Sequence, residues 1–543
     1  MIPLTPPELV AVTGGSLSRE VDLEASLTGV VIDSRQAGPG IVFVAVPGER
    51  ADGADFVDDA VRRGSPLAIV GRPVAGPAAL VDNPVAALGV LAEVSLRRAR
   101  NATGRPKVIG VTGSVGKTTT KDLLARIAAA EGPTVAPKGS FNNHLGVPLT
   151  VTRITPETRY LVVELGANHE GEIAGLAQIA PPDVAVVLGV SAAHIGEFGS
   201  IDAIGRAKGE LVSGLAPGGV AVLNFDDRRV AAMSYLTEGE IITFGFDSMA
   251  RITGHDVSES PEGHLVLTVE DQDAPGKLRI TTRLTGEQLA INVLAALAAA
   301  VAAGVPFTRA AAALEGVRPL SPHRMALTEL AGGVTLVDDA YNASPESMAG
   351  AIKTVARRAR QSGRRATAVL GAMLELGAAS EAAHLAAGEL VAKEGYDRLI
   401  VAGEEARGIY DGALAAGLAP EAAEIFPSIS AADLADHLAA TVQDGFALLK
   451  ASHGTGLWRV GEDLVERLGV EAGPTETADG GAGRDGSGLE TAEGDAAGRD
   501  AAGRDAAGRD AAGRDAAGRD AAGRDAAGRD AAGPNDGMGG RQC

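Results

Sequence analysis

The stretch Gly104-Arg-Pro-Lys-Val-Ile-Gly-Val-Thr-Gly-Ser-Val-Gly-Lys-Thr-Thr-Thr120 decides the fold of this chain. Its apolar run from Val108 to Val111 predicts a buried strand, and glycines bound the turn from Gly113 to Gly116. A helical pattern begins at Lys117. A strand, a tight glycine turn and a helix N-terminus together point backbone N–H groups at one spot, which suits the phosphates of a nucleotide.

The residues that follow the turn fit the same interpretation. We expect Lys117 to reach the terminal phosphates and the hydroxyl of Thr118 to bind Mg²⁺. The strict pattern G-x-x-x-x-G-K-[ST] fails because Val111 occupies the first glycine position, so the match is to the related form T-G-x-x-G-K-T-T. An ordinary turn before a helix is the alternative, and the Gly-Lys-Thr core between a strand and a helix argues against it.

Composition divides the chain into a body and a tail. From Ala496 the unit Ala-Ala-Gly-Arg-Asp repeats seven times, and its regular glycines weaken any helix. We therefore predict a disordered, low-complexity tail over residues 470–543. The whole chain has a net charge of −21, and the tail from Glu471 onward holds 15 acidic and 9 basic residues. The body therefore has a net charge of −15. An acidic body argues against a nucleic-acid partner.

The single cysteine and the apolar stretches of the sequence indicate the cellular compartment of the protein. The only cysteine is Cys543, so no disulfide can form within one chain, which fits a reducing compartment. The segment that begins at Met1 lacks the basic and apolar regions of a signal peptide. The stretch from Leu289 to Val305 is mostly alanine and contains Asn292, which predicts a buried helix rather than a membrane span. We therefore expect a cytoplasmic monomer with no membrane partner.

The pattern of strands and helices predicts an α/β protein of three domains. Alternating short elements over 1–103 predict a small α/β domain, with a linker at 101–106. Strands at helix-sized intervals over 104–318 predict a mostly parallel sheet of the P-loop ATPase type. Pro319-Leu-Ser-Pro322 marks the next boundary. The same period over 319–469 predicts a Rossmann-like domain, although no G-x-G-x-x-G follows its predicted strands.

Polar residues follow the predicted strands at the edge where parallel sheets bind ligands. Glu164 ends one strand, and beside a phosphate loop its carboxylate is placed to bind Mg²⁺. His194 follows another, where a hydrogen-bonded structural histidine is the simpler interpretation. Lys208, on a predicted helix, resembles a surface lysine paired with a glutamate. In the C-terminal domain, the run from Asp338 to Met348 could grip ribose or amide groups, and Arg324 could meet a phosphate from the neighbouring domain.

Taken together, these motifs resemble the Mur ligases, the ATP-dependent amide-forming enzymes of peptidoglycan precursor synthesis. The resemblance covers roughly residues 25–468, and so all three predicted domains. It is strongest to the members that add D-alanyl-D-alanine to UDP-N-acetylmuramoyl-tripeptide. Its most specific segments are Thr112-Gly-Ser-Val-Gly-Lys-Thr-Thr-Thr120, Asn142-Asn-His-Leu-Gly-Val-Pro-Leu-Thr150, Glu164-Leu-Gly-Ala-Asn168, His194-Ile-Gly-Glu-Phe-Gly-Ser200, Tyr341-Asn-Ala-Ser-Pro345 and Met373-Leu-Glu-Leu-Gly377.

The resemblance implies roles for residues in each predicted domain. It implies that Mg²⁺ is held by Thr118, Glu164, His194 and Lys208, with Lys208 carbamylated and therefore anionic. It implies that Lys117, Lys208 and His194 are catalytic. The implied ATP-binding set is Gly113, Ser114, Val115, Gly116, Lys117, Thr118, Thr119, Asn292, Arg324 and Asp339. The implied substrate-binding set is Ser34, Arg35, Asn142, Asn143, Tyr341 and Asn342, with Asp33–Arg35 and Gly48–Arg50 matching the segments that hold the UDP-sugar.

The implied reaction begins when the γ-phosphoryl group of ATP is transferred to the terminal carboxylate of the tripeptide. The resulting acyl phosphate is attacked by the free amine of D-alanyl-D-alanine, and a tetrahedral intermediate collapses to amide and phosphate. Mg²⁺ and Lys117 would neutralise the charge of two approaching anions. Because water would hydrolyse an acyl phosphate, the resemblance also implies that the domains close over the site.

Several positions depart from the family pattern. Gln288-Leu289 replaces a His-Asn or His-Gln pair, which puts the adenine contacts in doubt. The family's Lys-x-Ser-Arg reads Lys450-Ala-Ser-His453, which weakens the case for a carboxylate-binding arginine. The remaining departures are Ala372 for an acidic residue, Trp458 for a glutamate and Ala54 for a histidine. These changes leave the phosphate and metal residues intact, although they make reduced activity or altered substrate handling an open alternative.

Three alternatives remain beside the D-alanyl-D-alanine-adding activity. The ligase that adds diaminopimelate carries a D-N-P-R motif in its third domain, whereas Asp82-Asn-Pro-Val85 lies in the first domain and predicts a helix start. Folylpolyglutamate synthases share the central architecture and lack this kind of first domain. A non-catalytic paralogue would bind nucleotide without acceptor-dependent phosphate release.

Overall fold

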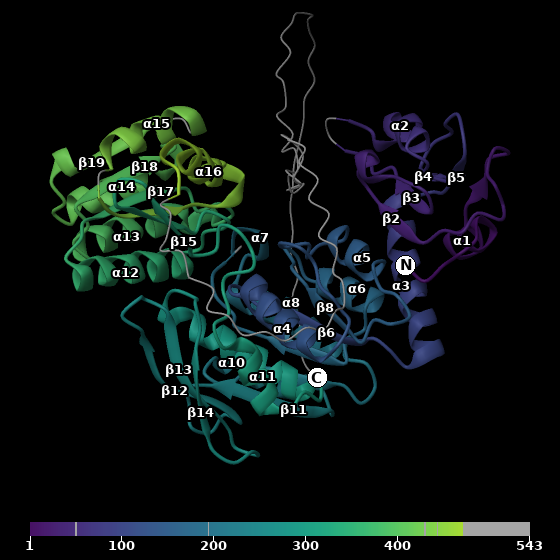
Figure 1. The fold of residues 1–543 in the computed structure, drawn as a ribbon, viewed down its shortest axis with the longest axis horizontal. Helices are drawn as coiled ribbons and strands as arrows, with labels where there is room; N and C mark the ends of the chain where they lie inside the picture. Colours follow the sequence, from purple (N-terminus) through teal and green to yellow (C-terminus); the bar gives the residue numbers. More distant parts are fainter. Residues whose placement is uncertain (49–50, 194, 428–429, 443, 471–543) are drawn as a thin grey trace, which may run out of the picture. The chain divides into compact units, whose positions relative to one another are not determined.

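A computed structural model describes residues 1–48, 51–193, 195–427, 430–442 and 444–470 of the chain. These residues belong to one compact unit that contains three β-sheets. Each sheet lies within one of the three ranges predicted from the sequence, and the three ribbons can be followed by colour in Figure 1. The α/β class is therefore confirmed. The predicted boundaries between domains stay predictions, and the predicted tail from residue 471 onward lies outside the described residues.

The N-terminal domain has a five-stranded sheet in the order β1-β5-β4-β3-β2, parallel except for β1. Its strands are β1 (Ser16–Leu17), β2 (Gly29–Val31), β3 (Ile41–Val44), β4 (Ala68–Val70) and β5 (Ala78–Leu80), and its helices are α1 (Pro6–Thr13), α2 (Val57–Arg62) and α3 (Pro84–Thr103). The side chain of Asn83 caps α3 by accepting from Val85 and Ala86, which confirms the predicted helix start. The predicted linker at 101–106 is wrong in its first half, because α3 continues to Thr103 and ends at the left-handed Gly104.

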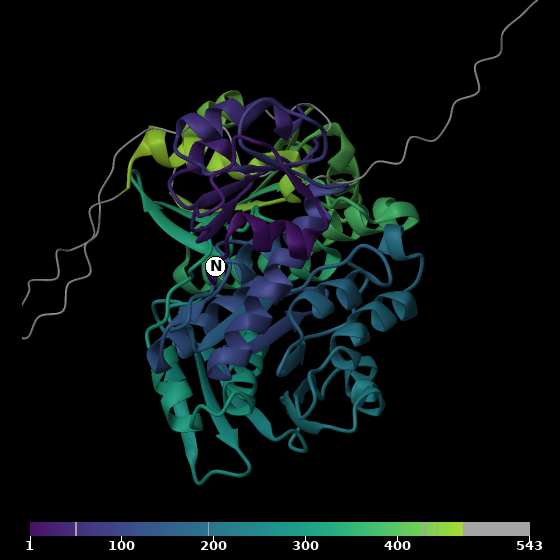
Figure 2. The same cartoon turned by 90° about the vertical axis from the view of Figure 1, so that its right-hand side faces the viewer.

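The middle domain has a nine-stranded sheet in the order β14-β13-β12-β11-β10-β9-β6-β8-β7. The strands from β7 to β12 are parallel, and β13 and β14 are antiparallel additions that the sequence did not predict. They form the long teal strands low in Figure 2. The strands are β6 (Lys107–Thr112), β7 (Thr134–Val135), β8 (Tyr160–Glu164), β9 (Val184–Val187), β10 (Val220–Asn224), β11 (Glu240–Gly245), β12 (Ile252–Glu259), β13 (Leu265–Asp271) and β14 (Lys277–Thr281).

Helices cover the middle sheet and bury its apolar strands. They are α4 (Lys117–Glu131), α5 (Gly146–Val151), α6 (Glu172–Ile179), α7 (Ile195–Phe198), α8 (Ile201–Ser213), α9 (Arg228–Ala231), α10 (Ala290–Ala302) and α11 (Phe307–Leu314). The predicted buried helix is confirmed as α10, which packs on α4 and on strands β11 and β12. Strand β6 lies between β8 and β9, so the phosphate loop that follows it starts from the interior of the sheet.

The C-terminal domain has a six-stranded sheet in the order β15-β16-β20-β17-β18-β19, with only β15 antiparallel among the described strands. Helices α12, α13 and α14 pack on one side, and α15 and α16 pack on the other (Figure 1). The strands are β15 (Ala326–Leu330), β16 (Val334–Asp338), β17 (Ala366–Gly371), β18 (Arg398–Ala402), β19 (Ala423–Phe426) and β20 (Gly445–Lys450). The helices are α12 (Pro345–Ser362), α13 (Ser380–Lys393), α14 (Arg407–Ala415), α15 (Ala431–Thr441) and α16 (Leu457–Leu468).

The core of the middle domain should depend on Phe244, which is fully buried on β11 in the cluster shared with α4 and α10. Removing its ring leaves a cavity, so Phe244→Ala should lower the free energy of unfolding by about 3–5 kcal/mol. Tyr235→Ala, at a side chain that is 80% exposed, is the control and should change it by less than about 0.5 kcal/mol. Chemical denaturation measures both, and equal losses would contradict this assignment of the core.

Candidate functional site

The turn between β6 and α4 leaves the start of α4 open toward the edge of the sheet. Helix α4 begins at Lys117, and its N-cap residue Gly116 has a left-handed backbone (φ 84°) and no side-chain cap. A Cβ on Gly116 would lie 2.2 Å from Nδ2 of Asn292, so the position of that side chain, like the backbone angle, favours glycine there. The N–H groups of the first turn are therefore left to bind an anion.

Neighbouring segments fix the shape of this turn. The Ser114 hydroxyl donates to the carbonyl of Ser191 (3.2 Å), and it accepts from the N–H of the same residue (2.9 Å). On the other side, Nδ2 of Asn292 donates to the carbonyl of Gly116 (3.2 Å) and to the Thr120 hydroxyl (3.0 Å). Asn292, predicted as an ATP contact, thus holds the loop itself. Val115 is 40% exposed at the tip of the loop.

Lys117, Thr118 and Glu164 meet directly behind the turn. Nζ of Lys117 donates to the carbonyl of Gly113 (2.9 Å), which places the ammonium group over the loop. The Thr118 hydroxyl donates to Oε2 of Glu164 (2.9 Å), and this carboxylate is 1% exposed. Desolvation lowers the pKa of Lys117, while the charge of Glu164 opposes that shift. The structure thus brings together a cation and two oxygen ligands in one small volume.

A second loop, between β7 and α5, adds amide and hydroxyl groups. Nδ2 of Asn142 donates to Oε1 of Glu164 (2.9 Å), so both oxygens of that carboxylate have partners. The Ser140 hydroxyl lies 2.7 Å from that of Thr118. Asn143 has a different role, because its Oδ1 accepts from the N–H groups of Leu145 and Gly146 at the start of α5. Asn143 therefore shapes the loop.

Lys208 is buried on α8 (4% exposed), so the interpretation of it as a surface lysine is wrong. Desolvation, together with the nearby charge of Lys117, lowers the pKa of Lys208 to about 7. A large fraction of its amine is therefore neutral near pH 7. This is the form of a lysine that reacts with electrophiles such as CO₂.

The C-terminal domain contributes Arg324 to the same place. Its Nη2 donates to the hydroxyls of Thr118 (2.9 Å) and Ser140 (3.0 Å). The guanidinium lies over the ring of Tyr341, 4.2 Å from the ring centre. Arg324 therefore lies beside the first turn of α4, to which Thr118 belongs, and its contact with a phosphate stays a prediction.

Asp339 and Asn342 lie behind Arg324, around a buried lysine that the sequence analysis did not assign. Nζ of Lys450 donates to Oδ2 of Asp339 (2.6 Å) and to the carbonyl of Asn342 (2.9 Å). The other oxygen of Asp339 accepts from the N–H of Met325 (3.1 Å). Lys450 is 1% exposed, so this ion pair is buried. Asp339 therefore shapes the backbone beside Arg324. Its contact with the ribose of ATP stays a prediction.

The remaining predicted site residues lie apart from this cluster or outside the described residues. Ser34 and Arg35 are in the N-terminal domain, where the Ser34 hydroxyl donates to Asp59 (2.9 Å) and Arg35 pairs with Asp33 (2.8 Å). Arg35 remains half exposed. Thr119 is partly exposed in the first turn of α4. His194, like positions 49 and 50, lies outside the described residues.

Sequence reasoning missed Ser140, His323 and Lys450. Nδ1 of His323 lies 2.6 Å from Oδ2 of Asp338, and although burial opposes it, Asp338 and Glu462 raise the pKa of His323. Lys450 stands in a quoted motif, but only the structure shows that its amine is buried. Ser140 carried no local signal, because its contacts are 22 and 184 residues away in sequence.

The structure shows side-chain contacts for three of the departures from the family pattern, Gln288, His453 and Trp458. Oε1 of Gln288 accepts from the Thr354 hydroxyl of α12 (3.0 Å), so its amide joins the middle and C-terminal domains. The ring of His453 stacks on that of Trp458, with 5.5 Å between centroids and 1° between planes. These two departures therefore pack on each other. Ala372 and Ala54 are buried small residues, and nothing in the structure explains these two substitutions.

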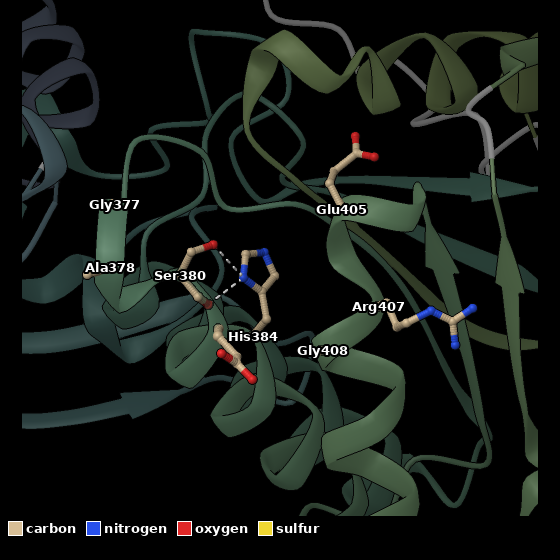
Figure 3. Close-up of a pocket in the computed structure, with 8 residues that line it drawn as sticks. Gly377, Ala378, Ser380, His384, Glu405, Arg407 and Gly408 are labelled. Carbon is tan, nitrogen blue, oxygen red and sulfur yellow. Dashed lines mark hydrogen bonds between the residues drawn. The ribbon is translucent and has the colours of Figure 1, made fainter.

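A hollow of about 440 Å³ in the C-terminal domain is a separate feature, shown in Figure 3. His384 lies buried beside it, with Nε2 accepting from the N–H of Met373 (2.9 Å). Nδ1 therefore carries the proton, and it lies 2.7 Å from the carbonyl of Ser380. Nε2 thus holds the loop that begins at Met373 and Nδ1 bonds within α13, which leaves His384 a structural residue.

Two further searches concern only the part of the chain that the structure describes. No group of three or more histidine, cysteine, aspartate or glutamate side chains there is arranged to hold a metal ion. No helix there is both long and apolar enough to cross a membrane. Around the phosphate loop, the oxygens of Thr118 and Glu164 are the kind of ligand that suits a hard cation such as Mg²⁺.

Comparison with known proteins extends over the whole body of the chain. Family models match three segments: "Mur ligase family, catalytic domain" at 26–102, "Mur ligase middle domain" at 111–300 and "Mur ligase, glutamate ligase domain" at 323–453. The UDP-N-acetylmuramoyl-tripeptide–D-alanyl-D-alanine ligase of Mycobacterium bovis is 39% identical over 86% of this chain and 98% of its own length. The Escherichia coli enzyme of that name is 33% identical over 75% of this chain and 88% of its own.

Solved structures of Mur ligases also resemble the structure of this chain. A crystal structure of MurF from Acinetobacter baumannii superposes with a TM-score of 0.74, at 30% identity over 86% of this chain and 99% of the other. MurF ligase from Thermotoga maritima in complex with ADP gives a TM-score of 0.68, at 30% identity over 81% of this chain and 98% of the other. With a phosphate loop, a buried glutamate and a cationic cluster at one edge of the middle sheet, and with relatives that match along nearly their full length, this chain belongs to the Mur ligase family.

Proposed function

We propose that this chain is an ATP-dependent ligase that joins D-alanyl-D-alanine to UDP-N-acetylmuramoyl-tripeptide in peptidoglycan precursor synthesis. The observation that carries the proposal is the convergence of Lys117, Thr118 and Arg324 on one open helix start, beside the buried carboxylate of Glu164. The relatives that match nearly end to end bear the name of this activity. The proposal includes a cytoplasmic location.

The residues of the cluster divide the chemistry between them. Backbone N–H groups at the start of α4 bind the phosphates, and Lys117 lies over the terminal one. Phosphoryl transfer to a carboxylate brings two anions together, and Lys117 and Arg324 offset that repulsion. The acyl phosphate is then attacked by the amine of D-alanyl-D-alanine. Mg²⁺ would be held by Thr118 and Glu164, with His194 and carbamylated Lys208, and it would neutralise charge between the phosphates.

The N-terminal domain is the proposed binding place of the UDP-sugar. Ser34 and Arg35 sit in a single turn of 3₁₀ helix capped by Asp33. The Arg35 side chain is half exposed, and a guanidinium is a group that binds phosphate or carboxylate through two hydrogen bonds. Asn142, Asn143, Tyr341 and Asn342 are proposed to line the path of the peptide toward the phosphate loop, since Asn142 contacts Glu164 and Tyr341 contacts Arg324.

An acceptor panel tests this function directly. With ATP, Mg²⁺ and UDP-N-acetylmuramoyl-tripeptide, only D-alanyl-D-alanine should drive phosphate release, and diaminopimelate, lysine and glutamate should not. Removing the charge at Lys117 (Lys117→Ala) should reduce that release by about a hundredfold or more, because it removes a cation from the transition state. Release driven by another acceptor would refute the assignment. Nucleotide binding without release would support the non-catalytic alternative.

Gly116→Ala tests the loop geometry. The new methyl group would meet Asn292 at 2.2 Å on a backbone with φ 84°, so ATP affinity should fall by at least about tenfold. Gly175→Ala on the exposed surface of α6 is the matched control, since its Cβ meets nothing within 4 Å and alanine favours a helix. Calorimetric titration with ATP measures both variants. Unchanged affinity in Gly116→Ala would place the nucleotide elsewhere.

Carbamylation of Lys208 should show an unusual pH dependence. Only the neutral amine reacts with CO₂, and burial lowers the pKa of Lys208 to about 7 from an ordinary 10.5, so the reactive fraction rises through neutral pH. We expect ¹³C-bicarbonate to give a carbamate NMR signal whose intensity reaches half of its maximum near pH 7. Lys208→Arg should lose both the signal and activity. A signal that appears only above pH 9, or activity that survives in Lys208→Arg, would contradict the proposed carbamate.

A further inference from the structure

Arg324 reaches the phosphate loop from the segment that joins the middle and C-terminal domains. Two hydrogen bonds join it to Thr118 and Ser140, and the ring of Tyr341 supports it from behind. A long, flexible arginine needs a fixed backbone if it is to meet a phosphate oxygen reproducibly. The question is therefore what fixes residues 321–325, which we call the Arg324 turn.

The backbone of the Arg324 turn is strained on both sides of the arginine. His323 and Met325 both adopt left-handed conformations, with φ values of 57° and 49°. A residue other than glycine in that region costs on the order of 1 kcal/mol or more. Neighbouring groups must compensate that cost, or the turn would relax and carry Arg324 away from the loop.

The C-terminal domain supplies one set of restraints. His323 is hydrogen-bonded to Asp338, and the N–H of Met325 donates to Asp339, so adjacent carboxylates at the end of β16 hold the two strained residues. Lys450 in turn holds Asp339, at 2.6 Å. These bonds fix the turn to its own domain, but they do not fix it to the phosphate loop.

The middle domain supplies the other restraint, through Asp122 on α4. The Ser321 hydroxyl donates to Oδ2 of Asp122 (2.6 Å), and Oδ1 of Asp122 pairs with the ammonium group of Lys121. Lys121 is 1% exposed, and it also donates to the carbonyl of Pro137 (3.0 Å). Asp122 is therefore a carboxylate held in place by a buried cation, with one oxygen directed at the turn.

The two contacts of the turn with α4 are one helical turn apart. Arg324 bonds to Thr118 and Ser321 bonds to Asp122, and residues four apart lie on the same face of a helix. The Arg324 turn thus runs along one face of the helix whose start binds the phosphates. Among the hydrogen bonds of the described residues, loss of the Ser321 contact would leave Arg324 as the link between the turn and α4.

We propose that Ser321 and Asp122 act as positioning residues that clamp the Arg324 turn to α4 and so set where the guanidinium meets the terminal phosphate. This inference rests on the proposed function for its chemical step, but its binding step requires only that ATP occupies the phosphate loop. Neither residue touches the reacting atoms. Their effect reaches the reaction through Arg324.

Ser321→Ala is the test, because it removes the hydroxyl and leaves the Asp122–Lys121 pair intact. We expect kcat/KM for ATP to fall by about tenfold to a hundredfold, the range expected when a catalytic group is displaced by about 1 Å. The KM for D-alanyl-D-alanine should not change, and the melting temperature should fall by no more than about 2–4 °C, since only one hydrogen bond is lost. Ser321→Thr keeps a hydroxyl and should restore activity. Ser362→Ala, which removes a hydroxyl bonded at the far end of α12, is the control.

A double-mutant cycle separates positioning from general stability. If Ser321 acts through Arg324, Ser321→Ala should have no further effect in an Arg324→Ala background. The proposal would be overturned if the double variant lost kcat/KM by the product of the two single losses. It would also be overturned if Ser321→Ala kept the wild-type kcat/KM. The same cycle can be measured without catalysis. Calorimetry then gives the affinity of the wild type, the two single variants and the double variant for an ATP analogue. A wild-type protein that binds the analogue but releases no phosphate would refute the proposed function and still leave the clamp testable.

Discussion

Crowding of positive charge behind one helix start is the constraint on which the site depends. Burial is the largest cause that lowers the pKa values of Lys117 and Lys208, and each is lowered further by a nearby cation, Arg324 beside Lys117 and Lys117 beside Lys208. Buried cations are costly in a folded protein, and the charge of Glu164, which raises the pKa of Lys117, offsets only part of the cost of burial. A polyanionic ligand supplies further negative charge beside these cations. The same feature that destabilises the free protein therefore favours triphosphate binding, and it keeps Lys208 partly neutral and reactive.

The fold makes this crowding possible by assembling the site from separate parts. Strand β6 and helix α4 provide the loop, and α10 secures it through Asn292. Glu164 is the last residue of β8, and Arg324 belongs to the C-terminal domain. Because the cations come from different elements, a movement of the C-terminal domain changes the charge at the loop. In the proposed reaction, this arrangement would link phosphoryl transfer to the domain closure that the resemblance implies.

Local patterns predicted the strand, loop and helix around Lys117, because each signal there spans only a few residues. They also predicted α10, whose alanine-rich sequence has no polar face to expose. They failed for β13 and β14, which pair antiparallel at the edge of a parallel sheet. They failed for the burial of Lys208 too, since burial depends on what packs over a helix. The contacts of Arg324 span about 200 residues, beyond the range of any local pattern.

A crystal structure with Mg²⁺ and a non-hydrolysable ATP analogue tests the account most directly. We predict that the triphosphate lies on the N–H groups at the start of α4, with the ammonium of Lys117 and the guanidinium of Arg324 on its terminal phosphate and the metal ion between Thr118 and Glu164. A triphosphate bound elsewhere, or a loop between Gly113 and Lys117 that remains empty at saturating analogue, would contradict it.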